Sequence, residues 1–130
     1  MPLYNLACRE PLDEATRERV ARAVTQAHCE VTGAPAEFVN VLFVHGYPLH
    51  GALTVDALGG VRKGGNRTAD VVERLRLALH DAIARSAGIA PGQVSVTLIG
   101  IPSNWVMEGG RVMPEPGTES QWLAQRDAGP

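Results

Sequence analysis

Two stretches of the sequence share one pattern. They read VTGAPAEFVNVLFVHGYP over residues 31–48 and SAGIAPGQVSVTLIGIP over residues 86–102. Each contains, in order, a glycine, an Ala-Pro pair, a β-branched apolar run, a further glycine and a proline. A glycine is typical of the residue that ends a helix, and a β-branched apolar run is typical of a buried strand. The two stretches therefore predict two helix-to-strand connections of one design, and we expect the run over 38–44 to be covered on both faces.

Apolar residues at helical spacing precede both stretches, which predicts a helix before each strand. Asp13 and Thr68 are suited to cap the starts of these helices, and Gly33 and Gly88 are suited to end them. Shifting the first helix by 55 residues places its apolar stripe on that of the second. The pattern therefore predicts a duplicated strand–helix–strand unit, with parallel strands inside each unit because a helix crosses between them.

The remaining segments complete a single domain over residues 1–130. The apolar stretch that follows Pro2 predicts a first strand, and ALTVDALGGV over residues 52–61 predicts a weaker one. The repeats would then span about residues 2–50 and 52–102. GGRVMPEPG in the tail over 103–130 predicts a hairpin or a strand with a tight bend, and the polar end of that tail is expected to be frayed.

Composition excludes several classes of function. The net charge of −2 gives no basic field for nucleic acid, and two cysteines, Cys8 and Cys29, are too few for a disulfide scaffold. No metal site is expected, because neither this pair nor the pair His45 and His50 has zinc spacing. The charged beginning of the chain and the lack of an 18-residue apolar run argue against a signal peptide or membrane span, so we expect a cytoplasmic protein.

Pro2 directly follows the initiator methionine and has two interpretations. It is a harmless first residue of a strand, which need not donate to the sheet. Alternatively, removal of Met1 frees its nitrogen as a secondary amine on a rigid ring, and such an amine can accept or deliver a proton. If Met1 is retained, that nitrogen is an amide and cannot act as a base.

Three blocks together resemble the tautomerase superfamily, and in particular its cis-3-chloroacrylic acid dehalogenase group. The first is PLYNLACREPLDEATRERVARAVTQAHCEVTG, with a proline at its head and a histidine late in the helix. The second is NRTADVVERL, with an arginine at the head of the second helix, and the third is GRVMPEPGTESQW, which follows a glutamate. The resemblance covers most of the chain from Pro2 to Trp122.

The resemblance implies an α+β fold of duplicated β-α-β units, with a mixed four-stranded sheet, two helices on one face and assembly as a homotrimer. It also assigns site residues. Pro2 would be the catalytic amine, Glu108 its acidic partner, and His28 would help hold a carboxylate or a water. Arg67, at the head of the second helix, would bind the substrate carboxylate. Trp105 either walls the pocket or contacts a neighbouring subunit.

This sequence departs from the group at two positions. The group has a second arginine shortly before the helix arginine; Arg62 takes that role if the loop RKGGN is expanded, whereas a gapless alignment places Gly64 there. The group also has a tyrosine where this chain has Thr97, so Thr97 would line the substrate site in its place. The missing tyrosine weakens the case for dehalogenation or hydration, in which a hydroxyl helps to activate water.

The resulting hypothesis is an isomerase that uses Pro2 for proton transfer on a small 2-keto acid or its enol carboxylate, with no metal or organic cofactor implied. Two alternatives stay within enzymes: a cis-3-haloacrylate dehalogenase or hydratase, favoured by Glu108, and a 3-oxo acid decarboxylase. A third alternative is a non-catalytic binding subunit, which retention of Met1 would favour. Phenylenolpyruvate and a 3-haloacrylate are the substrates that separate the enzymatic alternatives.

Overall fold

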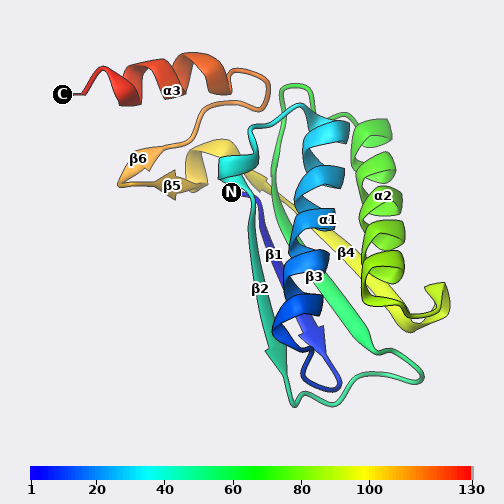
Figure 1. Cartoon of the computed structure of the whole chain (residues 1–130). Coiled ribbons are helices and arrows are strands. Elements are labelled where there is room, and N and C mark those ends of the chain that lie inside the picture. The colour runs from blue at the N-terminus through cyan, green and yellow to red at the C-terminus, as the bar shows by residue number, and fades with distance from the viewer. Residues whose placement is uncertain (130) are drawn as a thin grey trace.

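A computed structural model describes residues 1–129, and it contains the expected four-stranded mixed sheet in the order β2-β1-β3-β4 (Figure 1). β1 pairs in parallel with β2, and β3 pairs in parallel with β4. The two units join through the antiparallel pair of β1 and β3. The sheet strands are β1 (Leu3–Cys8), β2 (Asn40–His45), β3 (Val55–Lys63) and β4 (Val94–Pro102).

The two long helices begin and end where the capping residues predicted. α1 spans Glu14–Thr32, and the Asp13 carboxylate accepts from the Thr16 amide at 2.8 Å. α2 spans Ala69–Ala87, and the Thr68 hydroxyl accepts from the Val71 amide at 3.2 Å. Within residues 1–129 no helix combines the length and apolarity needed to cross a bilayer.

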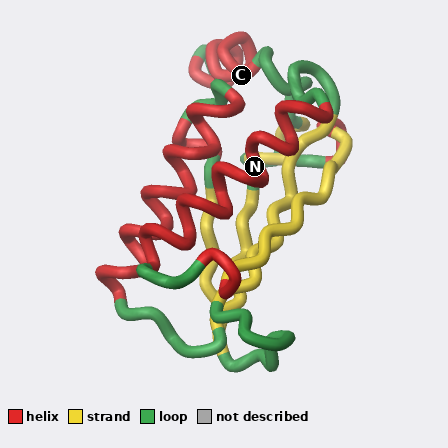
Figure 2. The backbone as a smooth tube through the Cα atoms, turned by 90° about the vertical axis from the view of Figure 1, so that its right-hand side faces the viewer, coloured by secondary structure: helices red, strands yellow, loops and turns green. Residues whose placement is uncertain are grey.

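Both helices lie against the same face of the sheet, as Figure 2 shows with helices on one side and strands on the other. Alternate residues of β1 and β3 point into this layer, where they bury a continuous apolar core between sheet and helices. The centre of that core comes from both helices and both units: Leu6, Val20, Val24, Leu75, Leu79 and Ile83.

The opposite face of the sheet is open in a single chain. Four aliphatic side chains on it are 45–49% exposed: Leu3, Leu42, Leu58 and Ile99. The expectation that residues 38–44 are covered on both faces is therefore wrong for the single chain. Residues 36–38 form a short 3₁₀ turn, and β2 exposes its alternate residues. An unbroken apolar run indicated burial on both sides, but the described part of the chain has a layer of helices on one face of the sheet only.

The C-terminal segment turns back over one end of the sheet (Figure 1). The expected hairpin is present, but the end that was expected to fray contains a third helix, α3. The Trp122 indole of α3 is buried, donates to the Val112 carbonyl at 2.9 Å and packs edge-on against Phe38. This anchor explains a helix that its polar sequence does not suggest. The remaining elements are η1 (Ala36–Phe38), η2 (Pro91–Gln93), η3 (Ser103–Trp105), β5 (Met107–Glu108), β6 (Arg111–Val112) and α3 (Glu119–Asp127).

Candidate active site

The amino terminus meets Glu108 at the end of the sheet that the C-terminal segment covers. The terminal amine of Met1 lies 2.9 Å from Glu108 Oε2, and neither side chain is fully exposed. Pro2 is buried, and its carbonyl accepts from the Asn40 amide at 3.0 Å, which ties it to the start of β2. β1 thus places Met1 beside a glutamate of the short β5–β6 hairpin, and the pairing of Pro2 with Glu108 stays a prediction.

A buried pair formed by Tyr4 and His28 lies between β1 and α1. The Tyr4 hydroxyl and His28 Nδ1 are 2.6 Å apart, and both side chains are about 1% exposed. Burial raises the pKa of Tyr4 well above its usual range. Burial, and then the positive charges of Arg67 and Arg62, lower the pKa of His28 to about 3. Both groups are therefore neutral near pH 7.

The hydrogen bond between these rings fixes the state of the other histidine nitrogen. Within the described residues the Tyr4 hydroxyl contacts no acceptor besides His28 Nδ1, and His28 Nε2 is buried without a partner. If the phenol donates to Nδ1, its proton is satisfied and Nε2 carries the ring N–H. If Nδ1 carried the ring proton instead, it would donate to the phenol oxygen. In the described part of the chain the phenol proton would then have no acceptor, and Nε2 would still have no partner. His28 therefore presents a buried N–H donor that has no acceptor among residues 1–129.

Arg62 at the end of β3 and Arg67 before α2 converge on one carboxylate, that of Glu119. Glu119 Oε1 lies 2.7 Å from Arg62 Nη2 and 4.0 Å from Arg67 Nη2. All three side chains are at least nine-tenths buried. Arg62 also donates to the Pro114 carbonyl, so its guanidinium is held from two sides by the C-terminal segment.

Glu119 was not among the residues that sequence reasoning assigned to the site. Burial by itself would raise the pKa of this carboxyl, but the Gly117 and Glu119 amides and the Arg62 guanidinium together hold it below its usual range. Glu119 is therefore ionised at neutral pH. The sequence carries no local signal for this role, because a glutamate in a first helical turn is ordinary and Arg62 is 57 residues away in the chain.

Arg67 is less completely engaged than Arg62. Its Nη1 contacts the Asn66 side chain and lies 3.5 Å from the Thr32 carbonyl, while its Nε is buried without a hydrogen-bond partner. Burial is the main cause that lowers the pKa of Arg67 from its usual value. A guanidinium with a free buried N–H has unused capacity to bind an anion.

The loop before Arg67 turns at two glycines with positive φ. Gly64 has φ of +95°, and a Cβ there would lie 2.7 Å from Glu115 Oε2. Gly65 has φ of +54°, and a Cβ there would lie 2.2 Å from the Pro116 carbonyl oxygen. A side chain at position 64 would be strained by this φ, and the flexible Glu115 carboxylate would have to shift. Arg62 is the arginine that shares Glu119 with Arg67, and its role as the second arginine of the resemblance stays a prediction.

Thr97 and Trp105 are not brought to this cluster within one chain. Thr97 lies on the open face of the sheet, where it lines a shallow hollow of about 370 Å³ together with Asn5, Tyr47 and Leu58. Trp105, in η3, is 74% exposed. Both assignments stay predictions, and both would place these side chains where a neighbouring subunit could cover them.

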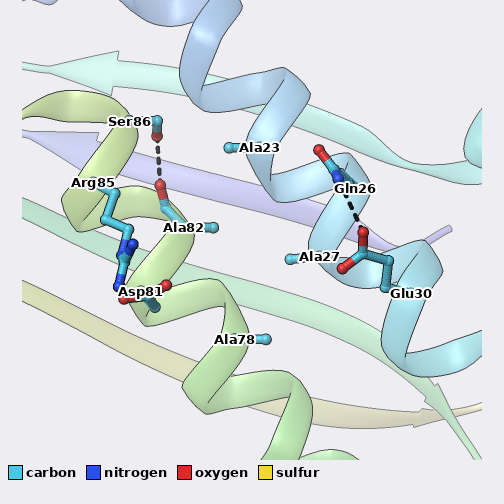
Figure 3. Close-up of a pocket in the computed structure, with 9 residues that line it drawn as sticks. All are labelled: Ala23, Gln26, Ala27, Glu30, Ala78, Asp81, Ala82, Arg85 and Ser86. Carbon is cyan, nitrogen blue, oxygen red and sulfur yellow. Dashed lines mark hydrogen bonds and ion pairs between the residues drawn. The ribbon is translucent and has the colours of Figure 1, made fainter.

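A larger hollow of about 440 Å³ lies elsewhere, in the groove between α1 and α2 (Figure 3). Its polar side chains bind one another: Gln26 donates to Glu30 at 2.9 Å, and Arg85 pairs with Asp81 at 2.9 Å. It is floored by alanines and presents no unpartnered buried polar atom, so it does not compete as a site. Among residues 1–129 no cluster of three or more histidine, cysteine or acidic side chains is arranged to bind a metal.

Comparison with solved structures gives strong matches. N1, a member of the cis-3-chloroacrylic acid dehalogenase family, superimposes with a TM-score of 0.86 and 28% identity, over 95% of this chain and 91% of its own. A fused 4-OT asymmetric trimer matches with a TM-score of 0.75 and 21% identity, over 85% of this chain and 95% of its own. The macrophage migration inhibitory factor of Toxoplasma gondii matches with a TM-score of 0.69 and 18% identity, over 86% and 100% respectively.

No protein-family model matches the sequence, and no curated protein matches it. The likenesses below 25% identity show the fold alone. The match to N1 extends over nearly the whole of both chains. The chain therefore has the fold of the tautomerase superfamily and is similar, within it, to the cis-3-chloroacrylic acid dehalogenase family, as the sequence blocks predicted.

Proposed function

We propose that the mature chain begins at Pro2 and is an isomerase that moves a proton on a small 2-keto acid or its enol. The observation that carries this proposal is the convergence at one end of the sheet. The amine of Met1 lies beside Glu108, which puts Pro2, the next residue, at this end of the sheet, while the buried Arg67 and His28 each have an N–H without a partner among the described residues. A basic nitrogen beside unused anion-binding donors is suited to enolate chemistry on a carboxylate.

In this reaction Pro2 takes a proton from one atom of the substrate and returns it to another. For an enol substrate, the Pro2 nitrogen accepts the hydroxyl proton, the oxygen becomes the ketone, and the carbon of the former double bond receives the proton. The bond changes balance without an oxidant, a reductant or a cofactor. Arg67 and the His28 N–H hold the carboxylate and offset the negative charge that develops on the enolate.

The protonation state of Pro2 depends on its charged neighbours. A base must be neutral near pH 7, and lowering an amine pKa by two to three units requires roughly 3–4 kcal/mol of differential interaction. Burial and the guanidiniums of Arg62 and Arg67 act in that direction, while Glu108 and Glu119 oppose it. The balance of these charges decides whether Pro2 is neutral and abstracts a proton or is protonated and donates one.

A second candidate is a cis-3-haloacrylate dehalogenase or hydratase. Glu108 supports it, because its carboxylate lies at the amino terminus, where it could orient an attacking water. N1 is described as a member of the cis-3-chloroacrylic acid dehalogenase family. Thr97 opposes it, since no tyrosine occupies that position.

We further propose that the active form is a homotrimer. The 4-OT neighbours are described as trimers. The open face of the sheet carries exposed Leu3, Leu42, Leu58 and Ile99, which water would not favour as a contiguous surface. In such an assembly this face would become the interior, and Thr97 would lie at a subunit boundary.

The first experiment is an intact-mass measurement on the protein purified from cells, followed by assays with phenylenolpyruvate and with a 3-haloacrylate. We expect a mass that lacks Met1 and rapid ketonisation of the enol. Arg67→Ala should lose activity. Arg74→Ala, which alters an exposed arginine of α2, is the matched control and should keep it. Halide release without ketonisation would favour the dehalogenase instead, and retention of Met1 in the purified protein would favour a binding subunit.

A further inference from the structure

Glu119 places a fixed negative charge inside the cluster of arginines. Its Oε1 is 2.7 Å from Arg62 Nη2, and both of its oxygens accept from the Gly117 amide, at 3.1 and 3.0 Å. These contacts hold the carboxylate at the start of α3, and α3 is itself fixed by the buried Trp122 indole. The position of this charge is therefore set by the C-terminal segment and does not depend on a ligand.

The two arginines differ in what they have left to offer a ligand. Arg62 donates through Nη2 to Glu119 and through Nη1 to the Pro114 carbonyl, so both ends of its fork are used. Arg67 is farther from Glu119, at 4.0 Å, and its buried Nε has no hydrogen-bond partner. The nearby His28 Nε2 is also buried without a partner. The Arg62 guanidinium is bound by acceptors of the protein itself, whereas the Arg67 guanidinium has a buried N–H that still lacks an acceptor among the described residues.

The cluster of Arg62, Arg67 and Glu119 has a net charge of +1, which is one unpaired cation. Two guanidiniums meet the Glu119 carboxylate in this cluster, and Glu108 lies outside it, 2.9 Å from the amine of Met1. At neutral pH His28 and Tyr4 add no charge. One carboxylate would neutralise the remaining cation, whereas a second carboxylate would enter this cluster with no cation left to pair with and would be repelled by Glu119, which is strongly unfavourable.

We propose that Glu119 is a positioning and specificity-determining residue: it commits Arg62 to an internal ion pair, leaves Arg67 for one substrate carboxylate, and so restricts the site to monocarboxylates over dicarboxylates. The inference rests on the proposed function, of which it names the substrate class. It also reassigns Arg62, which the sequence suggested as a second substrate ligand, to the internal pair.

The test uses two unreactive acids of equal chain length, butanoate and succinate, so that binding is measured without turnover. Dissociation constants are obtained by NMR or calorimetric titration for the wild-type chain and for Glu119→Gln. We expect the wild type to bind butanoate at least about tenfold more tightly than succinate, and Glu119→Gln to shift that ratio at least about tenfold toward succinate. Glu115→Gln is the matched control, because Glu115 is an exposed glutamate of the same segment.

Two further variants separate charge from folding. Glu119→Asp keeps the charge and should keep the wild-type preference within about threefold. Arg62→Met combined with Glu119→Gln removes both members of the internal pair, which avoids a lone buried guanidinium and leaves the net charge unchanged. This double variant should fold by circular dichroism and still prefer butanoate, because Arg67 remains.

Several results would overturn the inference: a folded Glu119→Gln chain with an unchanged ratio, a wild type that prefers succinate, or a double variant that no longer binds butanoate. The last result would show that Arg62 is itself a ligand. A wild type that binds neither acid overturns the inference together with the carboxylate site. Normal selectivity without ketonisation of enols would overturn the proposed isomerase and leave the role of Glu119 intact.

Discussion

The two strand–helix units have the same design but different interiors. α1 covers Glu14–Thr32 and α2 covers Ala69–Ala87, so both ends are offset by 55 residues. At this offset His28 corresponds to Ile83, and both are about 1% exposed. Tyr4 corresponds likewise to Gly59, and these two residues are also direct partners across the antiparallel strands. The first unit buries a polar pair where the second has an aliphatic side chain and a glycine.

This difference separates what the fold requires from what the site requires. An isoleucine at the equivalent helix position packs without any polar partner, so the scaffold does not need a histidine there. A buried polar pair costs desolvation that an apolar pair does not. Gly59 serves the pair, because a Cβ there would lie 2.6 Å from Tyr4 Cε1. The glycine at position 59 of the second unit therefore leaves the space that the Tyr4 ring of the first unit occupies.

The largest expected effect concerns Arg67, the contribution of the second unit to the site. Replacing it with alanine removes the buried guanidinium that would hold the carboxylate. If the proposed isomerase is correct, kcat/KM for an enol carboxylate should fall about 100- to 1000-fold, the range seen when one charge-stabilising donor is lost. Steady-state assays measure this. A fall of only a few fold would remove Arg67 from the proposed mechanism.

The next effect is the pH dependence that the polar pair gives to the first unit. The folded pKa of His28, about 3, lies below the value of about 6.5 in an unfolded chain. The contribution of neutral His28 to the free energy of unfolding is thus complete above about pH 6.5. It is lost as the pH falls toward 3, by up to about 1.4 kcal/mol per pH unit, because the unfolded chain takes up a proton that the folded chain does not.

A variant that makes the first unit resemble the second isolates this effect. Tyr4→Phe with His28→Leu has no group that titrates at this position. Urea unfolding of both proteins between pH 8 and pH 4.5 should show the wild type losing more stability below pH 6.5 than the variant. Parallel curves over that range would mean that His28 takes up a proton in the folded chain as readily as in the unfolded one.

A third test adds a methyl group at the glycine that faces the tyrosine. Gly59→Ala should destabilise the fold by about 2 kcal/mol, because both Tyr4 and Leu98 must move. Gly92→Ala is the control, since a Cβ there meets nothing within 4 Å. Combining Gly59→Ala with Tyr4→Leu should recover part of the loss; equal losses in both contexts would contradict the contact with the tyrosine ring.

The smallest effect concerns a feature that both units share, the cap at the start of the helix. Thr68→Ala removes the hydroxyl that accepts from the Val71 amide, and should cost about 1 kcal/mol of stability. Thr68→Ser keeps the hydroxyl and should cost less than half as much. Denaturant midpoints measure both. An alanine variant as stable as the serine variant would show that this cap contributes nothing.

Much of the architecture was predictable because its signals are local. The caps Asp13 and Thr68 and the terminating glycines act on backbone groups within one turn of the helix. The strand runs and their parallel pairing follow from alternation with helices. The third helix was missed, because its polar sequence is stabilised by the packing of Trp122 against Phe38, far away in the chain.

The sequence by itself determined the two capped helices, the duplicated unit and the identity of several candidate residues, since each depends on spacing within a short segment or on the blocks shared with a family. Only the tertiary structure decided that Glu119 meets Arg62 and Arg67, that the amine at the head of the chain meets Glu108, and that one face of the sheet stays open. Glu119 and Arg62 are 57 residues apart, and no local pattern encodes such a pair. It forms because closing the C-terminal segment over the end of the sheet buries two like charges, and these require a carboxylate between them.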